Sequence, residues 1–312
     1  MESLYQNFLN HYWGSYTKLI IDESIALFLK LWIYLILGIV ITSLIKIYLN
    51  REKIAGYLQK KNNLSIVTAS LIGIVSPLGS YIVIPLSAAL FNMGVPLPVL
   101  MALLVSSPLI DPNLFLLTAG AFGYELAIAR LLSAFILGIT AGYTTKWLQA
   151  KQFLHVAAVL SPGNQVARLN MPEKNTKPTL KIFLNELYRM ARFISKYFFL
   201  AILLAAAVKI LTPPNLMIRI FGQNNFFSVL LSTGAGIPFY VCGGAAIPVV
   251  QQLADLGMSQ GAVLAFFISG PVTKISNLIL MNAIYQARTF LVYLTVGILG
   301  AAFLGLIYNL FI

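Results

Sequence analysis

Residues 76–113 read SPLGSYIVIPLSAALFNMGVPLPVLMALLVSSPLIDPN, an almost wholly apolar stretch that prolines and glycines interrupt repeatedly. Proline removes a backbone hydrogen bond from a helix, and its ring clashes with the preceding turn. A continuous membrane helix would not carry so many of these residues, whereas short helices that stop and restart inside a membrane would. The stretch therefore predicts a broken-helix element with hinges at Pro77, Gly79, Pro85 and Pro108.

A similar stretch begins at Gly236 and reads GIPFYVCGGAAIPVVQQLADLGMSQGAVLAFFISGPVTKISN. Six identical pairs share one constant separation along the chain, which we call the repeat spacing: Ile84 with Ile247, Pro85 with Pro248, Leu90 with Leu253, Gly94 with Gly257, Ser106 with Ser269, and Pro108 with Pro271. In an apolar sequence, identical leucines and isoleucines often coincide by chance, whereas two prolines and a glycine at one fixed spacing do not. The sequence therefore predicts two duplicated halves, each with a broken-helix hairpin near the membrane centre. The expected hinges of the second copy are Pro238, Gly243, Gly244, Pro248, Gly270 and Pro271.

The composition is that of a membrane protein. Hydrophobic residues make up 59% of the 312 residues and charged residues 10%, with a mean hydropathy of +0.86. Soluble domains carry about 25% charged residues, so we expect an all-α polytopic membrane protein. The net charge of +12 is explained by basic cytoplasmic loops, and no nucleic-acid partner is expected. The expected partners are the lipid bilayer, a small-molecule solute and, in a homo-oligomer, further copies of the chain.

Sequence features of enzymes and metal proteins are missing. Cys242 is the only cysteine, which excludes an intramolecular disulfide and a two-cysteine metal site within the chain. His11 and His155 stand in polar flanks without partner spacing, and neither a phosphate loop nor an H-E-x-x-H motif occurs. We therefore expect no catalytic residues, no metal and no cofactor.

We divide the chain into a first transmembrane repeat (1–146), a cytoplasmic connecting loop (147–181) and a second transmembrane repeat (182–312). The expected elements are an interfacial helix Met1–Glu23, a first span Ser24–Leu49, the hairpin pieces Tyr81–Met93 and Leu97–Ser107 with their second copies Ala245–Leu256 and Gln260–Ser269, and the spans Glu125–Lys146, Ile182–Leu211 and Thr289–Phe311. Each hairpin piece is shorter than the roughly 20 residues of a full crossing. The alternative is that Leu64–Met93 forms one kinked crossing.

Basic residues indicate the orientation in the cytoplasmic (inner) membrane. Residues 46–61 hold five lysines and arginines and residues 146–196 hold nine, whereas residues 209–222, the counterpart of the first of these loops, hold two. We place loops 46–61 and 146–196 in the cytoplasm. Because equivalent loops then differ in charge, the pattern favours an inverted repeat over a parallel one.

Two charges deep in apolar sequence are the leading site candidates. Asp111 follows the first break and Lys274 the second, and the two are separated by the same repeat spacing. A charge at the bilayer centre costs at least about 2.5–3.5 kcal/mol unless it is paired or hydrated. The two residues could bind a polar substrate or form a salt bridge that breaks with proton or substrate binding. The alternatives are a static ion pair that holds the halves in register, or two side chains that merely reach the membrane interface. Glu125 and Arg130 lie near a span end, where an interfacial or structural role is expected.

Polar residues beside the breaks complete the predicted substrate site. A helix that breaks inside a membrane leaves open N–H and C=O groups that bind ions or polar solutes. The side chains expected to assist them are Ser80, Ser106, Ser107, Asn113, Cys242, Ser269, Thr273 and Asn277. For any single serine or threonine, a hydrogen bond to its own helix backbone is the simpler explanation.

The doubled pattern I-P-x4-L-x3-G-x11-S-[SG]-P resembles the ArsP-like permeases, a family that includes organoarsenical efflux permeases. It is carried by Ile84-Pro85, Leu90, Gly94 and Ser106-Ser107-Pro108, and again by Ile247-Pro248, Leu253, Gly257 and Ser269-Gly270-Pro271. The segment from Pro238 to Gly244 is similar to the family's glycine-rich turn. The resemblance implies an integral membrane permease with duplicated halves.

Two departures from the family pattern concern the substrate. Many members carry a cysteine pair where this chain has Gly79 and Tyr81, and they commonly carry asparagines where it has Asp111 and Lys274. Trivalent arsenic is soft and prefers thiolates, so the lone Cys242 makes a poor arsenic site. We therefore expect a secondary transporter for a charged or zwitterionic solute. The alternatives are an organoarsenical or metalloid efflux permease, a channel or membrane subunit of a larger complex and, least favoured, an intramembrane enzyme.

Overall fold

The computed structural model describes residues 2–48, 56–58, 64–76, 79–154, 180–211, 226–239 and 243–311, which form helices and no strand. The first half contains α1 (Glu2–Tyr48), α3 (Leu64–Val75), α4 (Gly79–Asn92), α5 (Leu97–Leu109), α6 (Pro112–Phe122) and α7 (Tyr124–Ala150). The second half contains α8 (Leu180–Leu211), α10 (Phe226–Phe239), α11 (Gly243–Asp255), α12 (Gln260–Thr273), α13 (Ile275–Ile284) and α14 (Ala287–Phe311). The expected all-α fold is confirmed.

Helix lengths and composition make this a multi-pass membrane protein. Among the described residues, three helical stretches are long and apolar enough to cross a membrane: Tyr16–Ile45 within α1, and the whole of α7 and α14. Two further helix pairs are together apolar enough to cross but are bent at a short break: α5 and α6 meet at a bend of 41°, and α12 and α13 at a bend of 42°. Counting each bent pair as one span gives five candidate crossings in the described parts of the chain.

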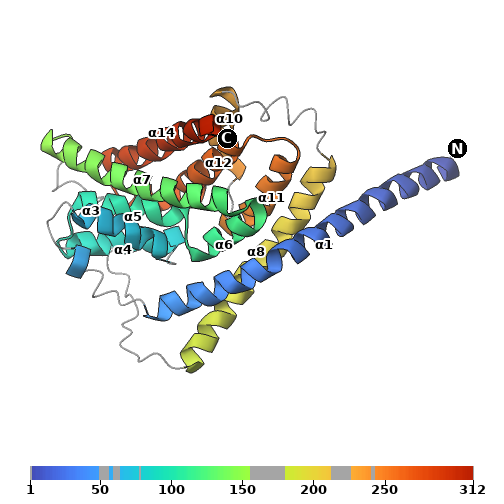
Figure 1. Ribbon diagram of the computed structural model, residues 1–312, viewed down its shortest axis with the longest axis horizontal. Coiled ribbons are helices and arrows are strands. Elements are labelled where there is room, and N and C mark those ends of the chain that lie inside the picture. Colours follow the sequence, from blue (N-terminus) through green and yellow to red (C-terminus); the bar gives the residue numbers. More distant parts are fainter. Residues whose placement is uncertain are drawn as a thin grey trace.

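Helix α1 corrects one sequence expectation. The predicted interfacial helix and the predicted first span form one continuous helix of 47 residues. No proline occurs between Glu2 and Tyr48, so nothing blocks the backbone hydrogen-bond ladder where a boundary was expected at Glu23. At 1.5 Å per residue the helix is about 70 Å long, and its amino-terminal part extends away from the other helices (Figure 1).

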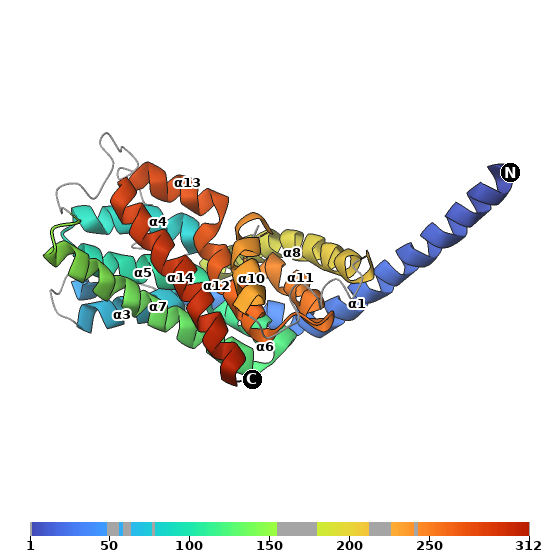
Figure 2. The same cartoon turned by 90° about the horizontal axis from the view of Figure 1, so that it is seen from above.

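Two helices form the centre of the molecule. Every residue of α5 is buried, as is every residue of α12 from Gly261 onward. Helix α5 packs against α3 and α7, and α12 packs against α10 and α14 (Figure 2). The central helices are also in contact with each other. Because they are apolar on all sides, neither shows the one-sided pattern of a surface helix.

The turns that join the short helices are alike in hydrogen bonding. Gly94 N donates to Phe91 O and Val95 N to Leu90 O; at the equivalent positions of the second half, Gly257 N donates to Ala254 O and Met258 N to Leu253 O. Gly94 and Gly257 have φ angles of 92° and 107°. Glycine ends helices in this way because it adopts positive φ without strain. The short apolar pieces that the sequence predicted on either side of these turns are confirmed.

Several expected hinges lie inside helices. Pro85 is inside α4 and Pro248 inside α11, so the helices continue through them. Pro108 and Pro271 likewise lie inside α5 and α12, in their last turns. A proline needs a φ that helices already supply, so losing one hydrogen bond need not end the helix. Of the other expected hinges, Gly79 and Gly243 begin helices, Pro238 and Gly270 lie within α10 and α12, Gly244 follows the start of α11, and Pro77 is outside the described residues.

Helices α1 and α8 form a pair beside this centre. They cross each other in opposite directions (Figure 1), and Lys209 Nζ of α8 lies 2.7 Å from Glu23 Oε1 of α1. Helix α1 also packs against α6, and α8 packs against α11. Helices α6 and α11 contact each other in turn. The α1–α8 pair therefore rests on the adjoining helices α6 and α11.

Candidate functional site

The first break separates α5 from α6. Ile110 and Asp111 both have extended backbone, with φ of −155° and −138°, and Pro112 begins α6. The residue before a proline is disfavoured in the helical region, which explains why the helix stops here. The Asp111 side chain accepts a hydrogen bond of 2.8 Å from Leu114 N and so caps the new helix. A carboxylate suits this place because a helix N-terminus carries partial positive charge.

Arg130 of α7 completes the first break, and sequence reasoning missed it. Its exposed fraction is 0%, although the sequence indicated an interfacial or structural position near a span end. Arg130 Nε donates to Leu109 O at 3.1 Å, and Nη1 donates to Thr118 Oγ1 at 2.9 Å. The guanidinium therefore caps the carboxyl end of α5, where a cation is favoured.

The same arginine links the two halves. Its guanidinium carbon lies 4.5 Å from the centre of the Phe267 ring on α12. A cation over an aromatic face is attracted by the ring, by about 2 kcal/mol or more when desolvated. The Arg130 charge also acts on the Asp111 carboxylate. Within the described residues there is no Asp111–Lys274 ion pair, so the basic neighbour of Asp111 comes from its own half.

The second break has a different set of side chains. Helix α12 ends at Thr273, Lys274 intervenes, and α13 begins at Ile275 without a side-chain cap. Asn277 Nδ2 donates to Pro271 O at 2.8 Å, so an amide here bonds an open carbonyl at the end of α12. Lys274 is half-buried. Tyr293 lies one repeat spacing after Arg130 and is also fully buried. We call two residues or helices related by this spacing counterparts.

Four predicted residues carry buried polar atoms without a hydrogen-bond partner in the described part of the chain. They are Ser107 Oγ, Asn113 Oδ1, Ser269 Oγ and Asn277 Oδ1. An unsatisfied buried polar group costs about 1–3 kcal/mol. Groups of this kind at both breaks provide hydrogen-bonding capacity for water or for a polar solute.

Other predicted residues are satisfied within their own helices. Ser106 Oγ donates to Ala102 O, and Thr273 Oγ1 donates to Ser269 O, both at 2.8 Å. Ser106 also packs so closely on Gly73 and Gly138 that a side chain at either glycine would collide with it. Cys242 and the side chain of Ser80 lie outside the described residues.

Two buried amides were not predicted. Gln251 and Gln252 of α11 are buried, and neither Oε1 atom has a hydrogen-bond partner among the described residues. Helix α11, which carries these amides, packs against α6, α8 and α12. The signal in the sequence was the pair of glutamines that follows the apolar run from Ala245 to Val250.

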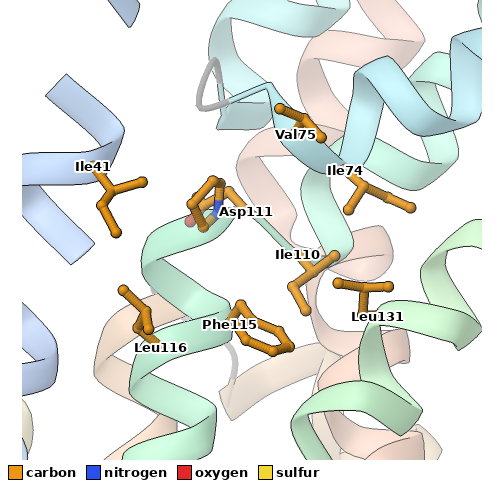
Figure 3. A pocket seen from close by; sticks show the side chains of 9 residues that line it. Ile41, Ile74, Val75, Ile110, Asp111, Phe115, Leu116 and Leu131 are labelled. Atoms are coloured by element: carbon orange, nitrogen blue, oxygen red, sulfur yellow. The ribbon is translucent and has the colours of Figure 1, made fainter. Parts of the chain in front are cut away.

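A cavity of about 240 Å³ adjoins the first break. Asp111 is the one charged residue of its lining; the apolar residues include Ile41, Ile74, Ile110, Phe115, Leu116 and Leu131. Figure 3 shows Ile41 on α1 facing α6, with Asp111 at the start of α6 and Leu116 farther along it. A mainly apolar pocket with one polar group is the usual form of a small-molecule site.

Similarity to known proteins agrees with this architecture. Residues 18–310 match the family ArsP_1, described as "Predicted permease". The chain belongs to the ArsP_1 family. This ArsP_1 member is 23% identical to the UPF0718 protein YcgR of Bacillus subtilis over 87% of its own length and 91% of that protein. The resemblance drawn from the doubled proline pattern is thus confirmed.

Two further relatives carry informative names or higher local identity. A Streptococcus mutans protein named as a two-component membrane permease complex subunit is 23% identical, over 86% of this ArsP_1 chain and 89% of that protein. The UPF0718 protein YraQ of Escherichia coli is 30% identical over 30% of this chain and 28% of that protein. No solved structure matches the chain. Family membership supports a permease rather than an enzyme.

Proposed function

We propose that the chain is a secondary transporter of the cytoplasmic membrane that moves a small charged or zwitterionic solute. The solute site lies at the interface of two duplicated, inverted halves. The observation that carries the proposal is the presence of unpartnered buried polar atoms at two equivalent breaks, on Ser107, Asn113, Ser269 and Asn277. Broken helices that expose backbone and side-chain polar groups inside a membrane are typical of transporter sites.

Three structural observations support the duplication. When the first half is shifted by the repeat spacing, each of its described helices, counted from Thr17 of α1 to the end of α7, coincides with a helix of the second half. The ends of the paired helices agree to within two residues. The two bends differ by one degree. A side chain at Gly142 would collide with Ile66, Pro98 O and Ala102; one at Gly305 would collide with their counterparts Val229, Gly261 O and Ala265.

The directions of counterpart helices support inversion. Arg288, at the start of α14, donates to Phe153 O, just after the end of α7. Farther along, Gly300 of α14 is packed on Leu137 of α7. These contacts require α7 and α14, which are counterparts, to run in opposite directions. The α1–α8 pair is antiparallel as well, which is the relation that an inverted repeat gives.

The domain limits and membrane sides follow from the same proposal. Residues 1–146 and 182–312 are the two repeats, and 147–181 is the cytoplasmic connection. Loops 46–61 and 146–196 face the cytoplasm because they hold most of the basic residues. Asp111 and Lys274 contribute the charges that distinguish this solute from a neutral arsenical. Ser107, Asn113, Ser269, Asn277 and the two buried glutamines contribute hydrogen bonds.

The test has two stages. First, the detergent-purified chain is heated with amino acids, alkyl carboxylates, alkyl amines and trivalent methylarsenic, because a ligand of the folded state raises its melting temperature. Second, the stabilising solute is offered to liposomes that contain the chain, and its flux is measured against concentration. We expect saturable flux of a charged or zwitterionic compound. Strong, Cys242-dependent resistance of cells to methylarsenic would favour the arsenical alternative instead.

A second candidate is a membrane subunit of a two-component permease. The name of the Streptococcus mutans relative favours it. In that case the purified chain alone would show no saturable flux, and transport would need a second membrane protein that co-purifies with it. Flux measured with and without that protein separates the two candidates.

A further inference from the structure

The α1–α8 pair covers only one of two equivalent faces of the molecule. It rests on α6 and α11, which contact each other. The counterparts of α6 and α11 are α13 and α4, and these also contact each other (Figure 2). Yet α1 packs on α6, whereas α8, the counterpart of α1, packs on α11 rather than on α13. The halves thus share their helices but differ in how the α1–α8 pair is placed.

Individual residues record the same asymmetry. Ile41 of α1 and Leu116 of α6 line one cavity, at the contact of these helices. Their counterparts, Leu204 of α8 and Ile279 of α13, are 56% and 66% exposed. Pro112 lines the same cavity, whereas its counterpart Ile275 is 62% exposed. The surface that α1 covers in the first half is open in the second.

The membrane does not strongly penalise either placement of the pair. Lipid tails are as apolar as leucine, so a membrane adds little penalty when the outer face of a helix is exposed. Moving the pair exchanges one set of apolar helix contacts for a counterpart set. Two arrangements separated by a few kcal/mol are both visited, the minor one at roughly 0.1–10%.

We propose that the chain has a second conformation, in which α8 covers α13 as α1 now covers α6. Leu204 and Ile279 then face each other, and Lys274 lines a cavity equivalent to the one at Asp111. Helix α1 leaves α6 in the same movement, which opens the Asp111 cavity. The inference rests on the duplication proposed above, and it gives the transporter two alternating site openings, one acidic and one basic.

Cysteine cross-linking in native membranes tests the second conformation. The background is Cys242→Ser. The test variant adds Leu204→Cys and Ile279→Cys; the positive control instead adds Ile41→Cys and Leu116→Cys. A collision control pairs Leu204→Cys with Ile128→Cys, since Ile128 of α7 is 48% exposed and belongs to neither face. The reagent is the shortest bifunctional maleimide that links the positive control.

We expect the test pair to link to a yield approaching the positive control. A link is irreversible, so it traps even a state populated at about 1%. The collision control should remain at background. A test pair that stays at the level of the collision control while the positive control links fully overturns the inference.

Solute flux measured in liposomes tests the proposed function independently of the cross-linking result. Saturable flux without a cross-link in the test pair would support the transporter and contradict the second conformation. A cross-link in the test pair without flux would support the second conformation and contradict the transporter. All four linked positions are apolar residues at the protein surface or cavity edge, so the variants should fold. The melting temperature of each variant is measured before linking to check this.

Discussion

The two broken spans bend by 41° and 42°, yet the charges at the two bends differ. At the first, Asp111 caps the new helix and Arg130 caps the old one, so both helix ends meet a charge of the favourable sign. At the second, a lysine and a tyrosine stand in the same places, and α13 has no side-chain cap. The first bend therefore has a charged cap at both helix ends and the second does not, although buried polar atoms without a partner among the described residues remain at both bends.

The largest effect is expected from Arg130→Met. The change removes the donor to Leu109 O and Thr118 Oγ1 and the cation beside Phe267, and each buried hydrogen-bond partner left unsatisfied costs about 1–3 kcal/mol. The matched change Lys274→Met affects a half-buried residue and should cost about 1 kcal/mol or less. The melting temperatures of the detergent-purified variants measure both. Equal losses at the two positions would contradict the contrast between the bends.

Neutralising the charges separates stability from transport. We expect Lys274→Asn to lower solute flux about tenfold, equivalent to about 1.4 kcal/mol, with little change in melting temperature. Asp111→Asn keeps a good capping side chain but removes the carboxylate on which the Arg130 charge acts, so it should lower both the flux and the melting temperature. Flux into liposomes and thermal unfolding are measured on the same preparations. Unchanged flux in Lys274→Asn would contradict a solute site at the second bend.

The hairpin turns offer a comparison in which the halves should agree. Gly94→Ala and Gly257→Ala each force a Cβ into positive φ, at a cost of about 1–2 kcal/mol. Because the two turns make the same hydrogen bonds, the losses in unfolding free energy should match within about 0.5 kcal/mol. Chemical denaturation of the purified variants gives the values. Clearly unequal losses would argue against equivalent turns.

The smallest effects are expected from two counterpart serines. Ser269 Oγ has no hydrogen-bond partner among the described residues, so Ser269→Ala should leave stability unchanged or slightly raised. Ser106→Ala removes a bond to Ala102 O and should lower stability by about 0.5–1 kcal/mol. Solute-induced stabilisation should weaken in Ser269→Ala alone. If both variants keep it, neither hydroxyl contacts the solute.

How much the sequence could predict depends on whether the cause was local. Glycine at a positive φ and proline at the start of α6 act on their own backbone, so the turns at Gly94 and Gly257 and the break before Pro112 could be predicted. Pro85 and Pro248 show the limit, because a proline marks strain but the surrounding packing decides whether the helix stops. The buried Arg130 contacts Phe267, which is far away in the sequence, and no local pattern contains that contact.

The ion pair between Glu23 and Lys209 has a consequence for the origin of the fold. Their counterparts, Glu186 and Lys46, are again an acid and a base in reversed order. Under the duplication proposed above, two antiparallel helices with this sequence relation would present the same surface to each other, as in a self-complementary contact. On that proposal, a half-length ancestor dimerised with a copy of itself inserted in the opposite orientation. Gene fusion would then have fixed one copy of each orientation within a single chain.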